Sequence, residues 1–304
     1  MLSQSQLDAY ERDGFVILKD FLTPGDTSGV VSEYEQIIDG RAKAAVAAGN
    51  LSSTFADEPF GTRFVKLAAV VPDITRGLDI MQVRGPEMFK FLHNPKMLDV
   101  MESIFGPELL CSPVQHVRIV PPTAVMKSQS AGAAYAWHQD YAVLWPEADG
   151  HLIGGFWIPI VDATLENGCL EVIPGSHKLG PLPHRKVSEV ETVPEAVPKV
   201  APTPVPVKAG DAILLRNYIL HRARVNSSNG IRWSLDLRYQ HPYTPTGRPY
   251  YPSFLVRSKM KPEAVQNDFE QWSRNWEFAL DATQNIKIYS RWDPPAVAAA
   301  KGAR

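Results

Sequence analysis

The segment YAWHQDYAVLW, residues 135–145, places a histidine and an aspartate two positions apart among aromatic and apolar residues. Because side chains at positions i and i+2 of a β-strand share a face, the segment predicts a strand from which His138 and Asp140 point the same way. An imidazole and a carboxylate so placed can bind one metal ion. Two histidines and a carboxylate on one face of the ion leave positions open for substrate and dioxygen, as in non-haem iron oxygenases. This chemistry therefore requires a second histidine.

A second histidine on another strand has two candidates. His221 ends the apolar run DAILLRNYIL, and His116 lies within SPVQHVRIV. The remaining histidines lie near turns, prolines or helix ends, where imidazoles are more often solvated than metal-bound: His93, His151, His177, His184 and His241. Both His221 and His116 are therefore considered as the third ligand.

The segment IRWSLDLRYQ, residues 231–240, alternates apolar and polar side chains with a period of two residues. The turn-like NSSNG before it predicts a hairpin in which Ala223 pairs with Arg232 and His221 with Ser234, if the loop holds an even number of residues. Arg232 would then share a face with His221. The polar face either meets solvent or, in a barrel, lines a cavity while the apolar face packs under helices. In the second case Arg232 suits two-point binding of a carboxylate.

The order of the predicted elements indicates a single domain over residues 1–304. Capping residues and helical spacing predict a mainly helical part at about 1–108, with a short strand at FVILKDFL. Short apolar or alternating runs separated by turn residues then predict a β-sandwich or barrel at about 109–257. Aromatic residues at helical spacing predict a C-terminal helix at about 262–283.

The composition is that of an ordinary globular protein. A formal net charge of −2 and 44% hydrophobic residues give no sign of a nucleic-acid partner. The apolar stretches are too short to span a bilayer and the first residues show no targeting pattern, so we expect a cytoplasmic protein with no membrane partner. Cys111 and Cys169 lack the spacing of a thiolate metal site, and we expect both to be buried small residues. The sequence predicts no oligomeric state.

Three motifs together resemble the phytanoyl-CoA dioxygenase family of iron(II)- and 2-oxoglutarate-dependent oxygenases. They are WHQD at 137–140, FWIPIVDATLENGCLEVIPGSHKLG at 156–180 and LHRARVNSSNGIRWSLDLRY at 220–239, with a weaker match in LDAYERDGFVILKDFL near the start. The His-x-Asp pattern alone is a weak signal, but here independent pieces of one site occur in the order of the family. The resemblance implies a mainly β protein with flanking helices: a double-stranded β-helix, or cupin-like jelly roll, wrapped by N-terminal and C-terminal α-helices.

The resemblance also implies the cofactors and the reaction. It makes His138, Asp140 and His221 the ligands of Fe(II), and Arg232 the partner of the distal carboxylate of 2-oxoglutarate. With O2 as the oxidant, the implied reaction is hydroxylation of a small organic molecule with release of succinate and CO2. Halogenating relatives carry a small residue in place of the carboxylate, so the presence of Asp140 indicates a reaction other than halogenation.

Further residues are assigned to the cosubstrate site. Trp157 matches a tryptophan that borders the cosubstrate, and Ser234 lies on the predicted polar face of Arg232. His116 matches a position that often contacts 2-oxoglutarate, and Gln115, one residue away, is the alternative for this contact. Three aromatic residues are predicted to form walls of the substrate pocket, with core packing as the equal alternative: Tyr141, Trp145 and Trp276.

The same residues fit other functions as well. The same cofactor chemistry serves desaturation, cyclisation or epimerisation in natural-product metabolism, which the sequence does not separate from hydroxylation. A cupin-like metal isomerase or binding protein, or a zinc hydrolase, would use similar ligands, but neither has a use for Arg232 on the inward face. We expect a small-molecule substrate without a coenzyme A group, because no basic cluster suited to its phosphates is evident.

Overall fold

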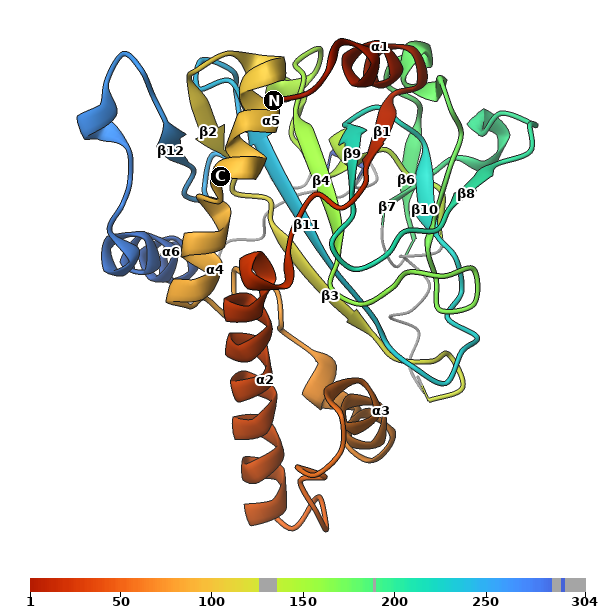
Figure 1. Ribbon diagram of the computed structural model, residues 1–304, viewed down its shortest axis with the longest axis vertical. Coiled ribbons are helices and arrows are strands. Elements are labelled where there is room, and N and C mark those ends of the chain that lie inside the picture. Colours follow the sequence, from red (N-terminus) through yellow and green to blue (C-terminus); the bar gives the residue numbers. More distant parts are fainter. Residues whose placement is uncertain (126–135, 188–189, 286–290, 293–304) are drawn as a thin grey trace.

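The computed structural model describes residues 1–125, 136–187, 190–285 and 291–292 of the chain (Figure 1). Its largest unit is a seven-stranded sheet in which neighbouring strands pair antiparallel. The strands in spatial order are β1 (Phe15–Leu18), β9 (Ala212–Arg216), β4 (Gly154–Pro159), β11 (Arg232–Gln240), β2 (Leu109–Cys111) and β12 (Phe254–Arg257), and β3 (His116–Val120) also pairs with β11. The long strand β11 thus lies at the centre of the sheet.

A second, smaller antiparallel sheet faces the inner side of this main sheet. Its strands in spatial order are β10 (His221–Ala223), β5 (Leu170–Val172) and β8 (Thr203–Val205). Apolar side chains from both sheets pack into one cluster between them, including Trp157 and Ile213 from the main sheet and Val172 from the small one. A separate hairpin consists of β6 (His184–Lys186) and β7 (Val190–Thr192). Two facing antiparallel sheets around a shared core form the predicted jelly roll.

Helices from both ends of the chain cover the outer side of the main sheet (Figure 1). The α-helices are α1 (Gln4–Asp13), α2 (Pro24–Ala47), α3 (Phe60–Val70), α4 (Pro86–Leu92), α5 (Pro95–Phe105) and α6 (Phe269–Thr283). Short 3-10 helices are η1 (Pro72–Thr75), η4 (Asp140–Val143), η5 (Pro146–Ala148), η6 (Ser176–Leu179), η7 (Pro194–Ala196) and η8 (Pro262–Ala264). None of the helices in the described ranges is long and apolar enough to cross a membrane.

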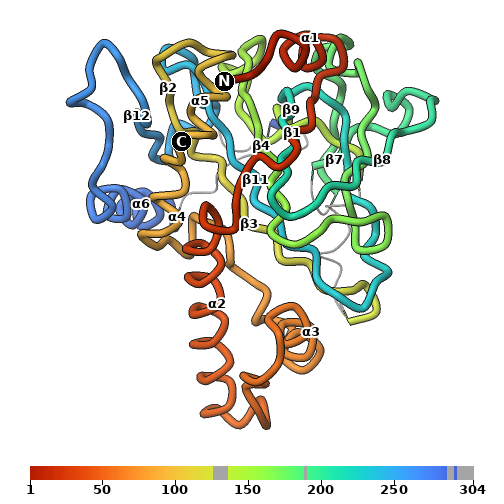
Figure 2. The backbone as a smooth tube through the Cα atoms, in the orientation of Figure 1, coloured from red at the N-terminus to blue at the C-terminus, as the bar shows by residue number. Residues whose placement is uncertain are grey.

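Local sequence signals explain where several helices begin and end. The Ser3 side chain accepts a hydrogen bond from the Gln6 backbone N–H, and the Gln6 side-chain oxygen accepts one from the Ser3 backbone N–H, a capping box that starts α1. Gly14 ends this helix with a φ of 83°, a left-handed conformation that favours glycine. At the other end of the chain, Asp268 caps α6, so this helix begins later than the predicted residue 262. Figure 2 shows α6 beside β12, at the opposite end of the main sheet from β1.

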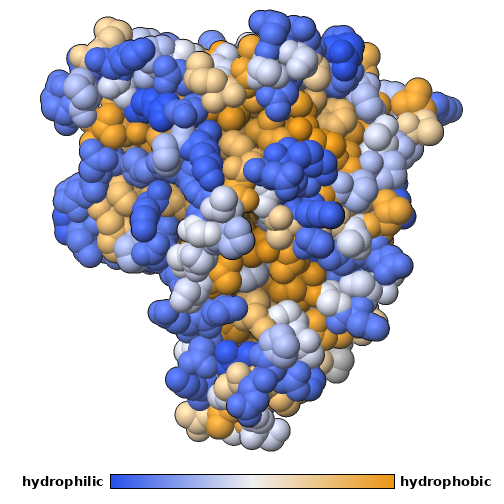
Figure 3. Space-filling model, viewed as in Figure 1, coloured by the Kyte–Doolittle hydropathy of each residue, from blue (hydrophilic) through white to orange (hydrophobic). Residues whose placement is uncertain are grey.

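The two faces of β11 lead to different environments. Trp233, Leu235 and Leu237 belong to the core shared with the helices, while Arg232 and Ser234 point to the side of the small sheet. The alternation in the sequence therefore reflects a barrel strand with helices over its apolar face, not a strand exposed to solvent. On the molecular face seen in Figure 3, hydrophobic side chains gather over the middle, beside the strands, and the far end of α2 is mostly hydrophilic.

The predicted hairpin before β11 is wrong. His221 pairs with Val172 in the small sheet, whereas Arg232 pairs with Val120 in the main sheet, so the connecting loop crosses between sheets. The loop has its own partners: the Ser227 N–H donates to the Glu166 carbonyl over 2.8 Å, and the Asn226 amide donates to the Val120 carbonyl over 3.1 Å. Arg232 and His221 consequently come from opposite sheets and do not share a face.

The predicted strand through His138 and Asp140 is also wrong. His138 forms only an isolated antiparallel bridge with His221, and Asp140 is the first residue of the 3-10 helix η4. The Tyr141 N–H donates to the Asn217 carbonyl over 3.0 Å, which helps to turn the backbone away from the strand direction. The two side chains nevertheless reach one site.

Candidate active site

The side chains of His138, Asp140 and His221 converge at one point. One potential ligand atom from each residue lies within 4.8 Å of those of the other two. Across the described ranges this is the one group of three or more such residues with a geometry suited to a metal ion. His221 is 6% exposed and shares a strand face with Ala223, which packs in the core between the sheets. The site therefore lies within the barrel.

The backbone brings the two histidines together. Each backbone N–H of His138 and His221 donates to the carbonyl of the other over 3.1 Å, and the ring centres are 4.3 Å apart. Each Nδ1 also lies at hydrogen-bond distance from a carbonyl two residues earlier, 2.9 Å to Ala136 and 3.1 Å to Ile219. Because a carbonyl only accepts, both Nδ1 atoms carry the proton, and both Nε2 lone pairs are left for a metal.

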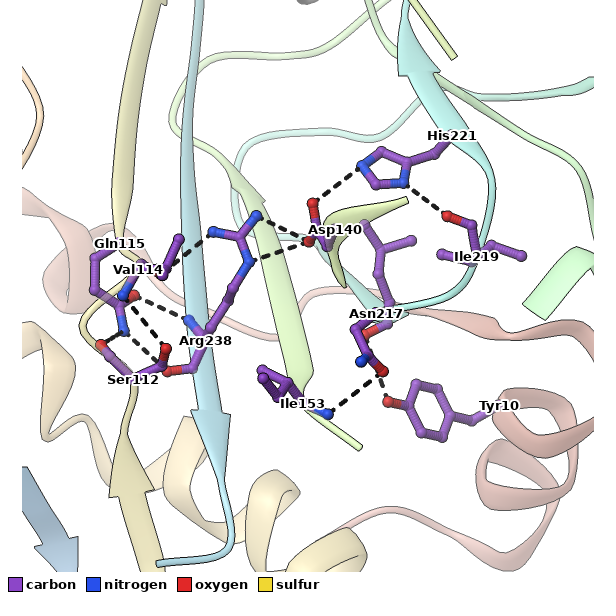
Figure 4. Close-up of polar contacts among 11 residues, drawn as sticks. Tyr10, Ser112, Val114, Gln115, Asp140, Ile153, Asn217, Ile219, His221 and Arg238 are labelled. Atoms are coloured by element: carbon purple, nitrogen blue, oxygen red, sulfur yellow. Dashed lines mark hydrogen bonds and ion pairs between the residues drawn. The ribbon is translucent and has the colours of Figure 1, made fainter. Parts of the chain in front are cut away.

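Asp140 lies between a histidine and a buried arginine (Figure 4). Its Oδ1 is 3.8 Å from Nε2 of His221, and its Oδ2 accepts hydrogen bonds from Nε and Nη2 of Arg238 at 3.1 and 2.8 Å. Arg238 was not among the predicted site residues. The signal for it was present in the sequence, because Arg238 occupies the same polar face of β11 as Arg232 and Ser234.

The electrostatics of the site suit a divalent cation. Burial, together with the neighbouring His221, lowers the pKa of His138 to about 4. Burial alone would raise the pKa of Asp140, but the charges of Arg238 and of the two histidines outweigh it and hold this pKa well below its usual range. At neutral pH the site therefore offers a neutral imidazole at His138 and an ionised carboxylate, the protonation states that metal binding needs.

The residues predicted to hold the cosubstrate lie on the inner face of the main sheet. Arg232 is 3% exposed, its Nη1 donates to Ser234 Oγ over 3.1 Å, and its guanidinium carbon lies 5.8 Å from the ring centre of Trp157. Trp157, in the neighbouring strand β4, lies opposite Asp236 of β11. The structure thus brings Arg232, Ser234 and Trp157 together in the barrel.

The structure also distinguishes the two neighbouring candidates for contact with the cosubstrate, Gln115 and His116. His116 lies opposite Asp236 and so shares the inner face, and its Nδ1 is 3.2 Å from the Asp79 carboxylate. Gln115, by contrast, is buried and binds main chain: its Nε2 donates to the carbonyl of Arg238 over 2.9 Å, and its Oε1 accepts from the N–H of the same residue. Only His116 is therefore placed to reach the interior, and its contact with a cosubstrate stays a prediction.

Several other predicted residues have packing roles. Trp276 is buried in the core outside the main sheet, stacked on Tyr251, as the core-packing alternative for this residue predicts. Trp145 packs edge-on against Tyr250 with ring centres 5.5 Å apart. Tyr141 follows Asp140 directly and donates its hydroxyl to the Leu182 carbonyl. The aromatic helix α6 therefore stabilises the outer core and supplies no wall of the barrel interior through Trp276.

A jelly-roll barrel in which two imidazoles and one carboxylate converge defines the class of non-haem iron oxygenases. The family model for phytanoyl-CoA dioxygenase matches residues 10–234 of this sequence. The chain therefore belongs to the phytanoyl-CoA dioxygenase family.

Curated relatives agree with this assignment. Phytanoyl-CoA dioxygenase domain-containing protein 1 of Mus musculus is 24% identical over 263 residues, which cover 76% of this chain and 87% of that protein. The peroxisomal phytanoyl-CoA dioxygenase of Rattus norvegicus is 23% identical over 260 residues, covering 79% of this chain and 68% of that protein. The resemblance seen in the sequence motifs is thus confirmed.

Solved structures share the fold. The non-haem monooxygenase ThoJ matches with a TM-score of 0.60 at 20% identity, over 92% of this chain and 99% of its own. EctD from S. alaskensis, solved with 2-oxoglutarate and 5-hydroxyectoine, matches with a TM-score of 0.55 at 19% identity, over 79% and 76% of the two chains. These likenesses confirm the jelly-roll fold.

Family membership also establishes the enzyme class. The chain is an Fe(II)- and 2-oxoglutarate-dependent oxygenase, with O2 as the oxidant. The donor set in the barrel fits this metal, because two imidazole nitrogens and one carboxylate oxygen form the facial triad of such enzymes. The prediction of the cofactors is thereby confirmed.

Proposed function

We propose that this enzyme hydroxylates a small organic molecule, with His138, Asp140 and His221 as the iron ligands. The observation that carries the proposal is the convergence of their ligand atoms within 4.8 Å, with both histidine Nδ1 atoms engaged by main-chain carbonyls. In the reaction one oxygen atom of O2 enters the substrate as a hydroxyl group and the other enters succinate, while 2-oxoglutarate loses CO2. Bound iron supplies the activation of dioxygen that side chains alone lack.

Arg232 is proposed to bind the distal carboxylate of 2-oxoglutarate. A guanidinium forms two parallel hydrogen bonds with a carboxylate, and a buried position strengthens that interaction because water does not compete. Arg232 is 3% exposed and is oriented by Ser234 and by the ring of Trp157. We therefore include Ser234 and Trp157 in the cosubstrate site, Ser234 as a hydrogen-bonding partner and Trp157 as an apolar wall.

His116 is proposed as a further contact of the cosubstrate. His116 lies on the inner face of β3, and its Nδ1 is 3.2 Å from the Asp79 carboxylate. The other ring nitrogen, Nε2, is not engaged by Asp79. Burial lowers the pKa of His116, so its ring is mainly neutral at neutral pH. With its Nδ1–H donating to the Asp79 carboxylate, Nε2 carries a lone pair, so the ring would contact the cosubstrate by packing and not by donating a hydrogen bond. The His116 ring therefore adds no positive charge that would oppose iron binding.

Hydroxylation is favoured over halogenation because Asp140 is present as a carboxylate. Desaturation, cyclisation and epimerisation use the same cofactors, and solved structures of similar fold include the epimerase SnoN and the carbocyclase SnoK of nogalamycin biosynthesis. Product analysis distinguishes these reactions, since only hydroxylation adds one oxygen atom to the substrate.

We further propose that the partner is a small molecule without a coenzyme A group. We also propose that the enzyme works in the cytoplasm, where its two buried free cysteines stay reduced.

The test is a screen for compounds that stimulate succinate formation. Purified protein is incubated with Fe(II), 2-oxoglutarate, air and single members of a panel of small molecules, and succinate and the product mass are measured. The proposal expects at least one compound to raise succinate formation and to gain one oxygen atom in wild-type enzyme, with neither effect in His221→Ala. His151→Ala, at a partly exposed loop position, is the control and should behave as wild type. Equal succinate formation in His221→Ala would contradict the proposed ligand set.

A further inference from the structure

The two oxygens of Asp140 have different surroundings (Figure 4). Oδ1 lies 3.8 Å from Nε2 of His221 and faces the imidazoles. Oδ2 accepts two hydrogen bonds from Arg238, from Nε at 3.1 Å and from Nη2 at 2.8 Å. One oxygen is thus turned toward the metal-binding point, while the other is occupied by a guanidinium.

The guanidinium of Arg238 is itself held in place. Its Nη1 donates to the carbonyl of Val114 over 3.3 Å, and the side chain is only 8% exposed. The backbone of Arg238 is fixed as well, because its N–H donates to Oε1 of Gln115 and its carbonyl accepts from Nε2 of Gln115, both over 2.9 Å. Gln115 and Val114 therefore determine where the Arg238 side chain points.

We propose that Arg238 is a positioning residue that fixes Asp140 as a ligand through Oδ1 alone. The inference rests on the proposed function, since it takes Asp140 to be an iron ligand. A carboxylate free to rotate can bind a metal through either or both oxygens, and two-oxygen binding would use a position that a facial triad leaves open. With Oδ2 bound to Arg238, the ligand set keeps its open positions for cosubstrate and O2.

A different explanation of the same contact makes the opposite prediction. If Arg238 only neutralised a buried carboxylate, its positive charge would repel a cation bound nearby, and its removal would strengthen metal binding. If Arg238 orients the carboxylate, its removal weakens metal binding, because outer hydrogen-bonding partners of metal ligands typically contribute about 10- to 100-fold to affinity. The direction of the change separates the two explanations.

The experiment measures Co(II) binding, because Co(II) occupies nitrogen and oxygen sites of this type and absorbs visible light. Affinity is determined for wild type, Arg238→Met and Arg238→Lys by competition with a chelator, without 2-oxoglutarate, and the Co(II) absorption band is recorded. We expect Arg238→Met to bind about 10- to 100-fold more weakly and with an altered band. Arg238→Lys keeps the charge but loses the two-donor contact with Oδ2, so it should also bind more weakly by several-fold.

Arg63→Met is the matched control. Arg63 is a comparably buried arginine that binds a carboxylate, with Nη2 at 2.7 Å from Oδ1 of Asp39, and its Nε donates to the carbonyl of Thr54. Loss of this pair removes a similar ionic contact at a position outside the metal site. The control should keep both the Co(II) affinity and the absorption band of wild type.

The outcomes separate this inference from the proposed function. Wild-type affinity in Arg238→Lys, or tighter binding by Arg238→Met, would overturn the positioning role and leave the iron site intact. Failure of wild type to bind Co(II), or wild-type binding by His221→Ala, would overturn the ligand set itself. If Arg238→Met does not fold, Arg238→Lys decides the matter alone, because it retains the buried positive charge beside Asp140.

Discussion

His138 and His221 form a reciprocal backbone pair, in which each N–H donates to the other's carbonyl over 3.1 Å and the rings lie 4.3 Å apart. This pair joins the segment before η4 to the first residue of β10, so two histidines distant in sequence are aligned by main-chain hydrogen bonds. Because the Nδ1 atoms are also bound to carbonyls, the direction of both rings is set before a metal arrives. The site is therefore preorganised by the fold.

Replacement of Arg232 by methionine should raise the KM for 2-oxoglutarate. The variant loses charge-assisted hydrogen bonds worth roughly 1.5–3 kcal/mol, which corresponds to about 10- to 100-fold. Steady-state succinate formation at varied 2-oxoglutarate measures the change. Arg222→Met is the control, since Arg222 pairs with Glu171 and lies over Trp137. An unchanged KM in Arg232→Met would show that this residue does not bind the cosubstrate.

Replacement of Leu237 by alanine should destabilise the fold. Leu237 is fully buried on the outer face of β11, and loss of such a side chain typically costs about 2–5 kcal/mol. Urea denaturation of the metal-free protein measures the free energy of unfolding. Leu165→Ala, at a position that is 50% exposed, should change this free energy by no more than about 0.5 kcal/mol. Equal effects of the two substitutions would contradict the burial of Leu237 in the core shared with the helices.

Gly168 should tolerate no side chain. Its φ is +103°, and a Cβ placed there would lie 2.7 Å from the carbonyl oxygen of Arg224. Gly168→Ala should therefore lower the free energy of unfolding by about 1–3 kcal/mol. Gly230→Ala is the control, because a Cβ at that position meets no atom within 4 Å. Thermal denaturation of both variants checks the prediction, and a wild-type melting temperature for Gly168→Ala would contradict it.

The metal-free protein should become less stable as the pH is lowered, partly because of His184. Burial lowers the pKa of His184 from 6.5 to about 4, and its Nε2 accepts a hydrogen bond from the Thr192 hydroxyl. Between about pH 4 and pH 6.5 the His184 side chain is protonated in the unfolded chain but not in the folded one. The free energy of unfolding therefore decreases as pH falls through this window, by up to about 1.4 kcal/mol per pH unit for such a group.

The test compares urea denaturation at pH 6.5 and pH 5 for wild type, His184→Gln and His151→Gln. His184→Gln should show a smaller loss of stability on acidification than wild type, because the titrating group is gone. His151→Gln, a loop substitution, should keep the wild-type pH dependence. The same loss in His184→Gln and in wild type would mean that burial of His184 does not contribute to acid sensitivity.

Patterns within single segments of the sequence predicted much of the fold. The two-residue alternation in 231–240 correctly separated an apolar from a polar face, because side chains alternate along any strand, and the structure selects the barrel alternative, with the apolar face against helices. The position of His221 after an apolar strand made it, with His116, one of two candidates for the third member of the metal-binding group, and the family resemblance selected His221. Capping residues located α1, since these interactions are local.

Long-range pairing was the part that the sequence did not predict. The turn residues at 226–230 predicted a hairpin, but they do not state which strands pair, and the loop instead connects two sheets. The partner of Asp140 was missed for the same reason, since Arg238 reaches it from β11 across the barrel. The helix α3 lacked a recognised start signal, because its cap position is Pro59 with no side-chain hydrogen bond.

The central claim is that His138, Asp140 and His221 form the catalytic iron site of a 2-oxoglutarate-dependent oxygenase. It is tested most directly by measuring Fe(II)-dependent conversion of 2-oxoglutarate to succinate by wild-type enzyme and by His221→Ala, at equal protein concentration and with folding checked by circular dichroism. We predict succinate formation by wild type that stops when iron is chelated, and none above background by the variant. Succinate formation that persists under strict chelation, or at the wild-type rate in His221→Ala, would contradict the claim.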